Sequence, residues 1–302
     1  MTRFVFLFAD GAQAAVKTAP QSVSLRRDAD TPADSLELTF ETAKPLFSTE
    51  PCGLRMERDG EVLFSGILDE HSVHEKGGVR TEFFSLRSRA AVLLDNEAAP
   101  GQLRMPSLRL METRFLLPYG IRAEAGDFSP KAGELVIEKG TSCWQAVCRF
   151  AESFLHCTPH CTREGALRFA ERAVKTLHLS DVQETELLRR PYAQISRVVV
   201  QNARSGAYNA VYENEAAAGV CRERYLSAYA KTAPRSLIAD GERQSLRLRV
   251  VCGGLVDGDP GDLCSFPTFG ASCEKMRLTA LRYRFAQGEE KTELTFEPAA
   301  VY

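Results

Sequence analysis

The most constraining feature of this sequence is the alternation of apolar and polar residues in short segments toward both ends of the chain. In residues 35–41 the alternation places Leu36, Leu38 and Phe40 on one face of an extended strand. Residues 245–250 alternate in the same way. A period of two residues is the pattern of a β-strand with one buried face, so both ends are predicted to be β-rich.

Turn signals separate the alternating segments of the first ninety residues. Asp59 and Gly60 form a dipeptide that accepts the positive φ angles of a tight hairpin, and Gly77 and Gly78 form a second one. The segment 81–86 returns from the second turn. Short strands at this spacing predict a small β-barrel or a sandwich.

Helical periodicity replaces this pattern in the middle of the chain. Residues 88–95 are predicted to form a short helix. Leu108, Met111 and Phe115 then recur at helical spacing, and Pro118 is expected to end that second helix.

The strongest helix signal begins at Ser142. With Gln145 it fits a capping box, in which the hydroxyl and the amide satisfy free backbone N–H groups reciprocally. Trp144, the single tryptophan, is assigned to the apolar face of this helix rather than to ligand binding. The apolar face of this helix comprises Trp144, Val147, Cys148, Ala151, Phe154 and Leu155.

After this helix, residues 163–169 predict a turn and a returning strand.

Strands dominate again after residue 193, for example in residues 195–200 and 292–296. The fold class is therefore predicted to be mainly β with an α+β insert. Two small β-barrel domains, residues 1–94 and 193–302, are expected to flank a middle α+β domain, residues 95–192.

Charge and hydropathy exclude several classes of function. The net charge is −2 and both signs are spread along the chain, so no basic surface for nucleic acid is expected. The apolar run near the N-terminus is too short for a signal-peptide core or a membrane span, so we expect synthesis in the cytoplasm and no membrane insertion. Nine cysteines without a paired framework indicate reduced thiols.

The densest group of potential metal ligands is His156, Cys157, His160 and Cys161, all within six residues. Zinc accepts each of these side chains, but a zinc site usually combines two such groups that are distant in sequence. A second group is not found, and four ligands from one hexapeptide would strain a tetrahedral shell. We therefore interpret these as ordinary hairpin residues, with zinc binding as the open alternative.

Two other groups resemble sites only superficially. Residues 257–262 contain three aspartates, but Pro260 and the spacing of the acids disagree with an EF-hand loop, so a β-turn is the better interpretation. His71 and His74 lie three residues apart on a predicted strand, which places them on opposite faces.

Sequence motifs for catalysis are missing. The chain contains neither Gly-x-Ser-x-Gly nor His-Glu-x-x-His, and it has no phosphate-binding glycine loop with lysine. We therefore predict no catalytic, cofactor-binding or metal-binding residues and no enzymatic activity. A hydrolase that uses two of the many carboxylates stays an alternative.

The order of these segments resembles one known family. Residues 88–100 (SRAAVLLDNEAAP) look like the segment that closes the first domain of phage tail hubs, and residues 116–121 (LLPYGI) resemble the segment that follows it there. Residues 140–154, followed by 163–169, are similar to that family's helix and hairpin. The turn at residues 260–262 and a final hairpin ending at residue 298 resemble its last barrel. The family is that of contractile-tail baseplate hubs, also called late control protein D or 43 kDa tail protein, which includes the phage Mu hub. It is related to the N-terminal part of type VI secretion VgrG spikes.

The resemblance implies a virion structural protein rather than an enzyme. Its expected form is a homotrimer, in which two related barrels per subunit make a ring that adapts a sixfold tail tube to a threefold spike. Expected partners are further copies, the tube, the spike and other baseplate proteins, in a phage or prophage tail assembled in the bacterial cytoplasm. A tail-associated cell-wall hydrolase and a carbohydrate- or receptor-binding β-module are the alternatives.

Overall fold

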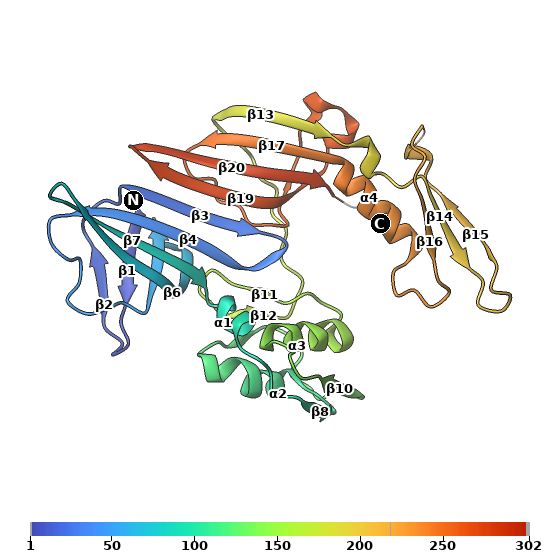
Figure 1. Ribbon diagram of the computed structural model, residues 1–302, viewed down its shortest axis with the longest axis horizontal. Coiled ribbons are helices and arrows are strands. Elements are labelled where there is room, and N and C mark those ends of the chain that lie inside the picture. Colours follow the sequence, from blue (N-terminus) through green and yellow to red (C-terminus); the bar gives the residue numbers. More distant parts are fainter. Residues whose placement is uncertain (1, 218, 300–302) are drawn as a thin grey trace. The chain divides into compact units, whose positions relative to one another are not determined.

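The computed structural model (Figure 1) describes residues 2–217 and 219–299. Its chain divides into two compact units. Unit 1 comprises Met1–Ala173 together with Arg282–Glu290. Unit 2 comprises Val174–Leu281 and Lys291–Tyr302. The described part of the chain is mainly β, as the sequence predicts.

Unit 1 contains an antiparallel sheet in which seven strands follow the order β2-β1-β5-β6-β7-β4-β3. Most neighbours in this sheet are also neighbours in sequence, so short turns connect them. The strands are β1 (Thr2–Leu7), β2 (Gln13–Val16), β3 (Ser22–Asp28), β4 (Thr31–Thr42), β5 (Gly53–Arg58), β6 (Glu61–Lys76) and β7 (Val79–Ser88).

The two predicted hairpins of this sheet are confirmed. Asp59 and Gly60 connect β5 to β6 with φ angles of 52° and 90°, and Gly77 and Gly78 connect β6 to β7 with 60° and 82°. Two consecutive positive φ angles are the geometry of the turn whose twist matches that of the strands. The sequence predicted both turns because these residues accept that geometry.

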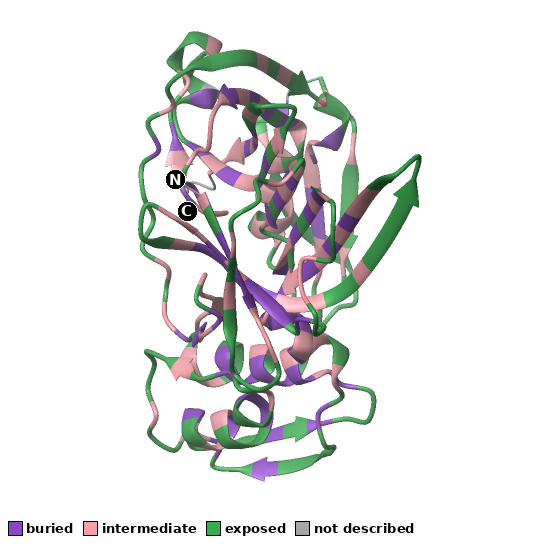
Figure 2. Ribbon diagram, turned by 90° about the vertical axis from the view of Figure 1, so that its left-hand side faces the viewer, coloured by how far each residue is buried: buried purple, intermediate pink, exposed green. Residues whose placement is uncertain are grey.

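Aromatic side chains fill the inner face of the unit 1 sheet. Phe40 and its alternating neighbours Leu36 and Leu38 are fully buried, which confirms the predicted strand face. Phe84 of β7 contacts Phe6 with ring centroids 4.9 Å apart and Phe40 at 6.1 Å, both edge to face. Figure 2 shows that burial concentrates in the strands and helices while the loops are mostly exposed.

The helices of unit 1 surround a second core. The predicted helices at residues 88–95 and after residue 107 are present as α1 and α2, and α2 continues through a π-helical turn into a 3₁₀ turn that contains Pro118. The elements are α1 (Ala90–Asp95), β8 (Gly101–Arg104), α2 (Leu108–Met111), η1 (Glu112–Leu116), η2 (Leu117–Tyr119), β9 (Ala123–Glu124), β10 (Glu134–Ile137), α3 (Cys143–Phe150), η3 (Ala151–Leu155), β11 (His160–Cys161) and β12 (Leu167–Arg168).

The capping box that starts α3 is confirmed. The Ser142 hydroxyl accepts from the Gln145 N–H at 3.1 Å, and the Gln145 side chain accepts from the Ser142 N–H at 3.0 Å. Val147 and Ala151 of the predicted stripe are fully buried. Trp144 is partly buried against the same core, so it packs as the sequence predicted.

Unit 2 contains a second antiparallel sheet with the strand order β13-β17-β20-β19, and β18 pairs with β19. Residues 282–290, the tip of the β19–β20 hairpin, are assigned to unit 1. The strands are β13 (Val182–Arg189), β17 (Leu246–Gly253), β18 (Leu263–Cys264), β19 (Met276–Ala286) and β20 (Glu289–Pro298), with 3₁₀ turns η6 (Pro267–Phe269) and η7 (Ala271–Cys273).

A small three-stranded sheet lies between β13 and β17 in the sequence. It has the order β15-β14-β16, and the helix α4 contacts β14. The sequence did not predict α4, which begins with Pro234 at its first turn. The elements are η4 (Pro191–Ala193), β14 (Arg197–Gln201), β15 (Tyr208–Glu213), η5 (Glu215–Ala217), β16 (Glu223–Leu226) and α4 (Pro234–Ser245).

Neither unit contains a closed barrel in the part of the chain that is described, so the predicted two-barrel arrangement is not confirmed. Within the described residues, no helix has the length and hydropathy needed to cross a bilayer.

Candidate functional site

The hexapeptide with four possible zinc ligands is built into the fold as a helix end and a short strand. His156 ends η3 with a φ of 52°, and Cys157 packs against the second core of unit 1. His160 and Cys161 form β11 and pair with β12. Burial raises the pKa of the Cys161 thiol to about 12, which disfavours the thiolate that a metal binds. Across the described residues, no three His, Cys, Asp or Glu side chains are grouped in a way that could hold a metal ion.

The aspartate-rich turn is held together by one buried carboxylate. Asp262 accepts hydrogen bonds from the N–H groups of Lys175 at 3.1 Å and Asp259 at 2.9 Å. Its side chain faces inward and is fully buried. The turn is therefore anchored to a segment 87 residues earlier in the chain, which is the role of a structural aspartate.

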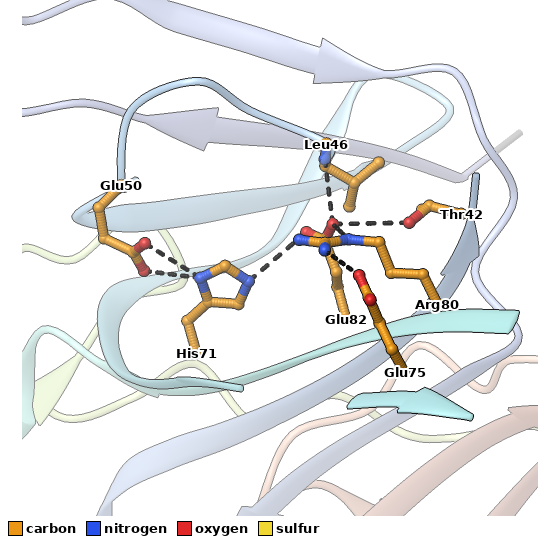
Figure 3. Close-up of polar contacts among 7 residues, drawn as sticks. All are labelled: Thr42, Leu46, Glu50, His71, Glu75, Arg80 and Glu82. Atoms are coloured by element: carbon orange, nitrogen blue, oxygen red, sulfur yellow. Dashed lines mark hydrogen bonds and ion pairs between the residues drawn. The ribbon is translucent and has the colours of Figure 1, made fainter. Parts of the chain in front are cut away.

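A concentrated group of charges lies in unit 1, where β6 and β7 meet the connection between β4 and β5 (Figure 3). We call this group the His71 cluster; it consists of Glu50, His71, Glu75, Arg80 and Glu82. The connection, residues 43–52, is called the strap.

His71 lies between two carboxylates. Its Nδ1 is 2.8 Å from an oxygen of Glu50, and its Nε2 is 3.5 Å from an oxygen of Glu82. The ring also stacks on Phe84 with centroids 4.3 Å apart and planes 6° from parallel. A protonated imidazole has two N–H donors and can bond to both carboxylates, whereas the neutral ring has one.

Glu82 is the centre of the cluster because most of the polar contacts meet at its carboxylate, which is almost completely buried. It accepts from Arg80 Nε at 2.9 Å, from the Leu46 N–H at 3.2 Å and from the Thr42 hydroxyl at 3.5 Å. A buried charge is tolerated only when such partners surround it. The carboxylates of Glu82 and of Glu75 on β6 raise the pKa of Arg80, which therefore stays charged.

The His71 cluster holds the strap to the sheet through a side chain at one end and a backbone group in the middle. Glu50 bonds to His71, and the Leu46 N–H bonds to Glu82 (Figure 3). Between them Phe47 packs on Phe6 and Phe8, with ring centroids 4.7 Å and 5.4 Å apart. The strap is thus attached by polar and aromatic contacts together.

The geometry of the cluster fits a structural role better than catalysis. Both ring nitrogens of His71 already face carboxylates, and no hydroxyl among the described residues hydrogen-bonds to the ring. The hollow beside the cluster has a volume of about 100 Å³, which is room for a few water molecules. Pockets for small-molecule ligands are usually about 300–1,000 Å³.

The sequence reasoning separated His71 from His74 correctly but missed the cluster. His71 pairs with Phe84 on the inner face of the sheet, while His74 pairs with Thr81 and is exposed. Glu82 alternates with Phe84 and therefore occupies a core position of β7. A charged residue at an inward position of an apolar strand was the available signal.

The sequence matches no protein-family model and no curated protein. The structure nevertheless resembles solved structures over nearly its whole length. A tail protein from Neisseria meningitidis MC58 matches with a TM-score of 0.71 and 17% identity, covering 98% of this chain and 96% of that one. The 43 kDa tail protein of prophage MuSo2 from Shewanella oneidensis matches with a TM-score of 0.75 and 14% identity, covering 97% and 98%.

A third similar structure comes from a secretion system. The E. coli c3393 protein, a component of the type VI secretion system with structural similarity to phage T4 tail proteins, matches with a TM-score of 0.57 and 10% identity, covering 94% of this chain and 75% of that one. The resemblance predicted from the sequence is therefore confirmed at the level of the fold: along almost its entire length, this chain is folded like phage tail proteins.

Proposed function

We propose that this protein is a structural subunit of a contractile phage tail or of a phage-like tail, and that it forms the hub of the baseplate. In this role three copies make a ring that adapts the sixfold tail tube to the threefold spike. Its partners are further copies of itself, the tube, the spike and other baseplate proteins. Its place is the virion tail, assembled in the bacterial host.

One observation carries the proposal: the likeness to two tail proteins covers at least 96% of both chains in each comparison. A shared catalytic or binding domain would cover only part of a longer protein. Here the likeness extends over nearly the whole of both chains. It therefore favours a structural role in a tail, which depends on the complete fold, over the activity of a single domain. The His71 cluster agrees with this role because its contacts stabilise the fold.

The finer organisation belongs to the same proposal. Residues 1–94 and 193–302 would be the two related β-barrel domains of each subunit, and residues 95–192 would be the middle α+β domain. A separate middle region is supported by the second core of unit 1, which draws its buried residues from Leu93 to Phe169, whereas the boundary between the two compact units follows Ala173. A ring built from repeated head-to-tail contacts uses one pair of complementary surfaces in every subunit.

The mass of the purified full-length protein tests the proposal. We expect three times the chain mass by native mass spectrometry and a threefold ring by electron microscopy. A protein that stays single at high micromolar concentration would refute the hub.

A second measurement distinguishes the hub from the cell-wall hydrolase. The purified protein is incubated with peptidoglycan, and the turbidity and released fragments are followed. We expect no release above a heat-denatured sample, while clearing by a single chain would favour the hydrolase.

A further inference from the structure

The three-stranded sheet of unit 2 has two edges that lack a second neighbour among the described residues. Its order is β15-β14-β16, so β15 and β16 are the outer strands. All six residues of β15 are exposed, including the large side chains of Tyr208, Val211 and Tyr212. Edge strands are commonly protected from pairing by lysine or proline, and β15 contains neither.

The surface around this sheet has the composition of a protein interface. Five of the eight tyrosines of the chain lie between residues 192 and 229, and all five are exposed. Tyrosine and arginine are enriched at the contacts that contribute most to protein association. The five tyrosines are Tyr192, Tyr208, Tyr212, Tyr225 and Tyr229.

The directions of the two edge strands are compatible with antiparallel pairing between copies. β15 is antiparallel to β14, whereas β16 is parallel to it. The two edges therefore run in opposite directions. When β15 of one copy lies beside β16 of the next in a continuous sheet, the new pair is antiparallel, which is slightly the more stable arrangement.

The charges of the two edges are complementary. β15 ends with Glu213, and Glu215 follows it. On β16 the charge of Glu223 is compensated by Arg197 of β14 at 3.2 Å, which leaves Arg224 as the exposed charge of that strand. An acidic edge facing a basic edge is attractive, whereas two copies of the same edge would repel each other.

We propose that β15 of one copy pairs with β16 of a second copy, and that this contact joins the subunits head to tail. The occupant of each edge is thus another copy of this chain. The inference rests on the proposed ring, for which it names the contact surface. Because two different edges meet, the contact can repeat until a ring closes.

Two variants block one edge each. Ala210→Lys with Val211→Lys puts a lysine on each face of β15. Arg224→Glu replaces the exposed positive charge of β16 by a negative one and leaves the ring contact between Tyr225 and Tyr208 of β15 in place. Val136→Lys is the matched control, because Val136 is 55% exposed on the short strand β10 and Val211 is 43% exposed on β15.

The first readout is the concentration dependence of the mass by sedimentation. We expect wild type and the control to form the trimer. Each edge variant should raise the dissociation constant by about 30-fold or more, as the loss of one dominant contact does. Circular dichroism and thermal unfolding show whether each variant is folded.

Mixing the two edge variants gives the sharper result. Each variant keeps one intact edge, and those two edges are the ones that pair. We therefore expect the mixture to form a dimer of one copy of each variant, although each variant alone stays single. This rescue also demonstrates that both variants are folded.

The outcomes separate this inference from the proposed function. A wild-type ring that both edge variants retain would overturn the β15–β16 contact and leave the hub intact. Dissociation of the control, or two folded edge variants that stay single when mixed, would also overturn it. A wild-type protein that never associates would refute the hub and this contact together.

Discussion

Replacing Glu82 by alanine tests whether one buried carboxylate holds the strap to the sheet. The change removes the acceptor for Arg80 Nε at 2.9 Å and for the Leu46 N–H at 3.2 Å, and it removes the carboxylate that lies 3.5 Å from His71. Glu82 is 1% exposed, so water cannot replace these contacts without opening the structure. Removing one member of a buried charged pair costs about 3–5 kcal/mol of unfolding free energy.

Two further variants provide unfolding free energies with which the loss in Glu82→Ala can be compared. Glu82→Gln keeps an oxygen acceptor but loses the charge, so we expect a smaller loss of about 2 kcal/mol. Glu75→Gln removes the other carboxylate that bonds to Arg80, at 2.6 Å, but Glu75 is 66% exposed. Exposed pairs contribute about 0–1 kcal/mol, so this control should be nearly neutral.

Urea unfolding measures the free energy, and hydrogen exchange locates the effect. Because the chain has two units, a single transition is not assumed, and the exchange of the Leu46 amide is the local readout. We expect Glu82→Ala to speed exchange in the strap while unit 2 stays unchanged. Equal effects of Glu82→Ala and Glu75→Gln, or an unchanged strap, would refute the reasoning.

Three further outcomes follow from other contacts in unit 1. Gly66→Ala places a Cβ in steric overlap with the Arg87 carbonyl oxygen, so we expect the free energy of unfolding in urea to fall by about 1–3 kcal/mol. An unchanged midpoint would contradict this packing. Since burial raises the pKa of Cys161 to about 12, maleimide at pH 8 should label the exposed Cys52 at least about 100-fold faster, and equal rates would disprove the burial. Arg87 lowers the pKa of Asp95 by hydrogen bonding; a carboxyl with a lowered pKa stabilises the fold above its unfolded pKa and loses this effect as the pH falls through the folded value. Arg87→Met should therefore show a shallower loss of stability below about pH 4 than wild type in acid unfolding, and identical acid curves would refute the linkage.

Local signals explain why much of the fold was predictable from the sequence. The turns at Gly60 and Gly78 and the capping box at Ser142 depend on residues that are adjacent or three apart, so their patterns are visible directly. The order of these elements also carried the family resemblance. The closure of strands into barrels depends on contacts between distant strands, which periodicity does not report.

The helix α4 shows how tertiary contacts decide an element that has a weak local pattern. Its sequence contains Gly241 in the middle and few apolar residues, which argues against a helix. Gly241 nevertheless allows close packing on the preceding segment, since a Cβ there would lie only 3.0 Å from the Ala193 carbonyl oxygen. Pro234 at the first turn was the remaining sequence signal.

The candidate site was less predictable than the fold. Glu50 and His71 are 21 residues apart, and the strap between β4 and β5 has no periodic pattern that predicts where it packs. Only Glu82, a charge at an inward strand position, was detectable from the sequence. The positions of β15 and β16 at the edges of their sheet were equally hidden, because strand order depends on contacts between distant segments.

The hairpin tip at residues 282–290 has a consequence for synthesis. Glu290 binds Arg58 at 3.0 Å, and Tyr283 of the same tip is buried in the fold. The ribosome makes these residues roughly ten to fifty seconds after Arg58, at about 5–20 residues per second. Unit 1 therefore cannot be completed until residues 282–290 have been synthesised, although its other residues, 1–173, are made long before them.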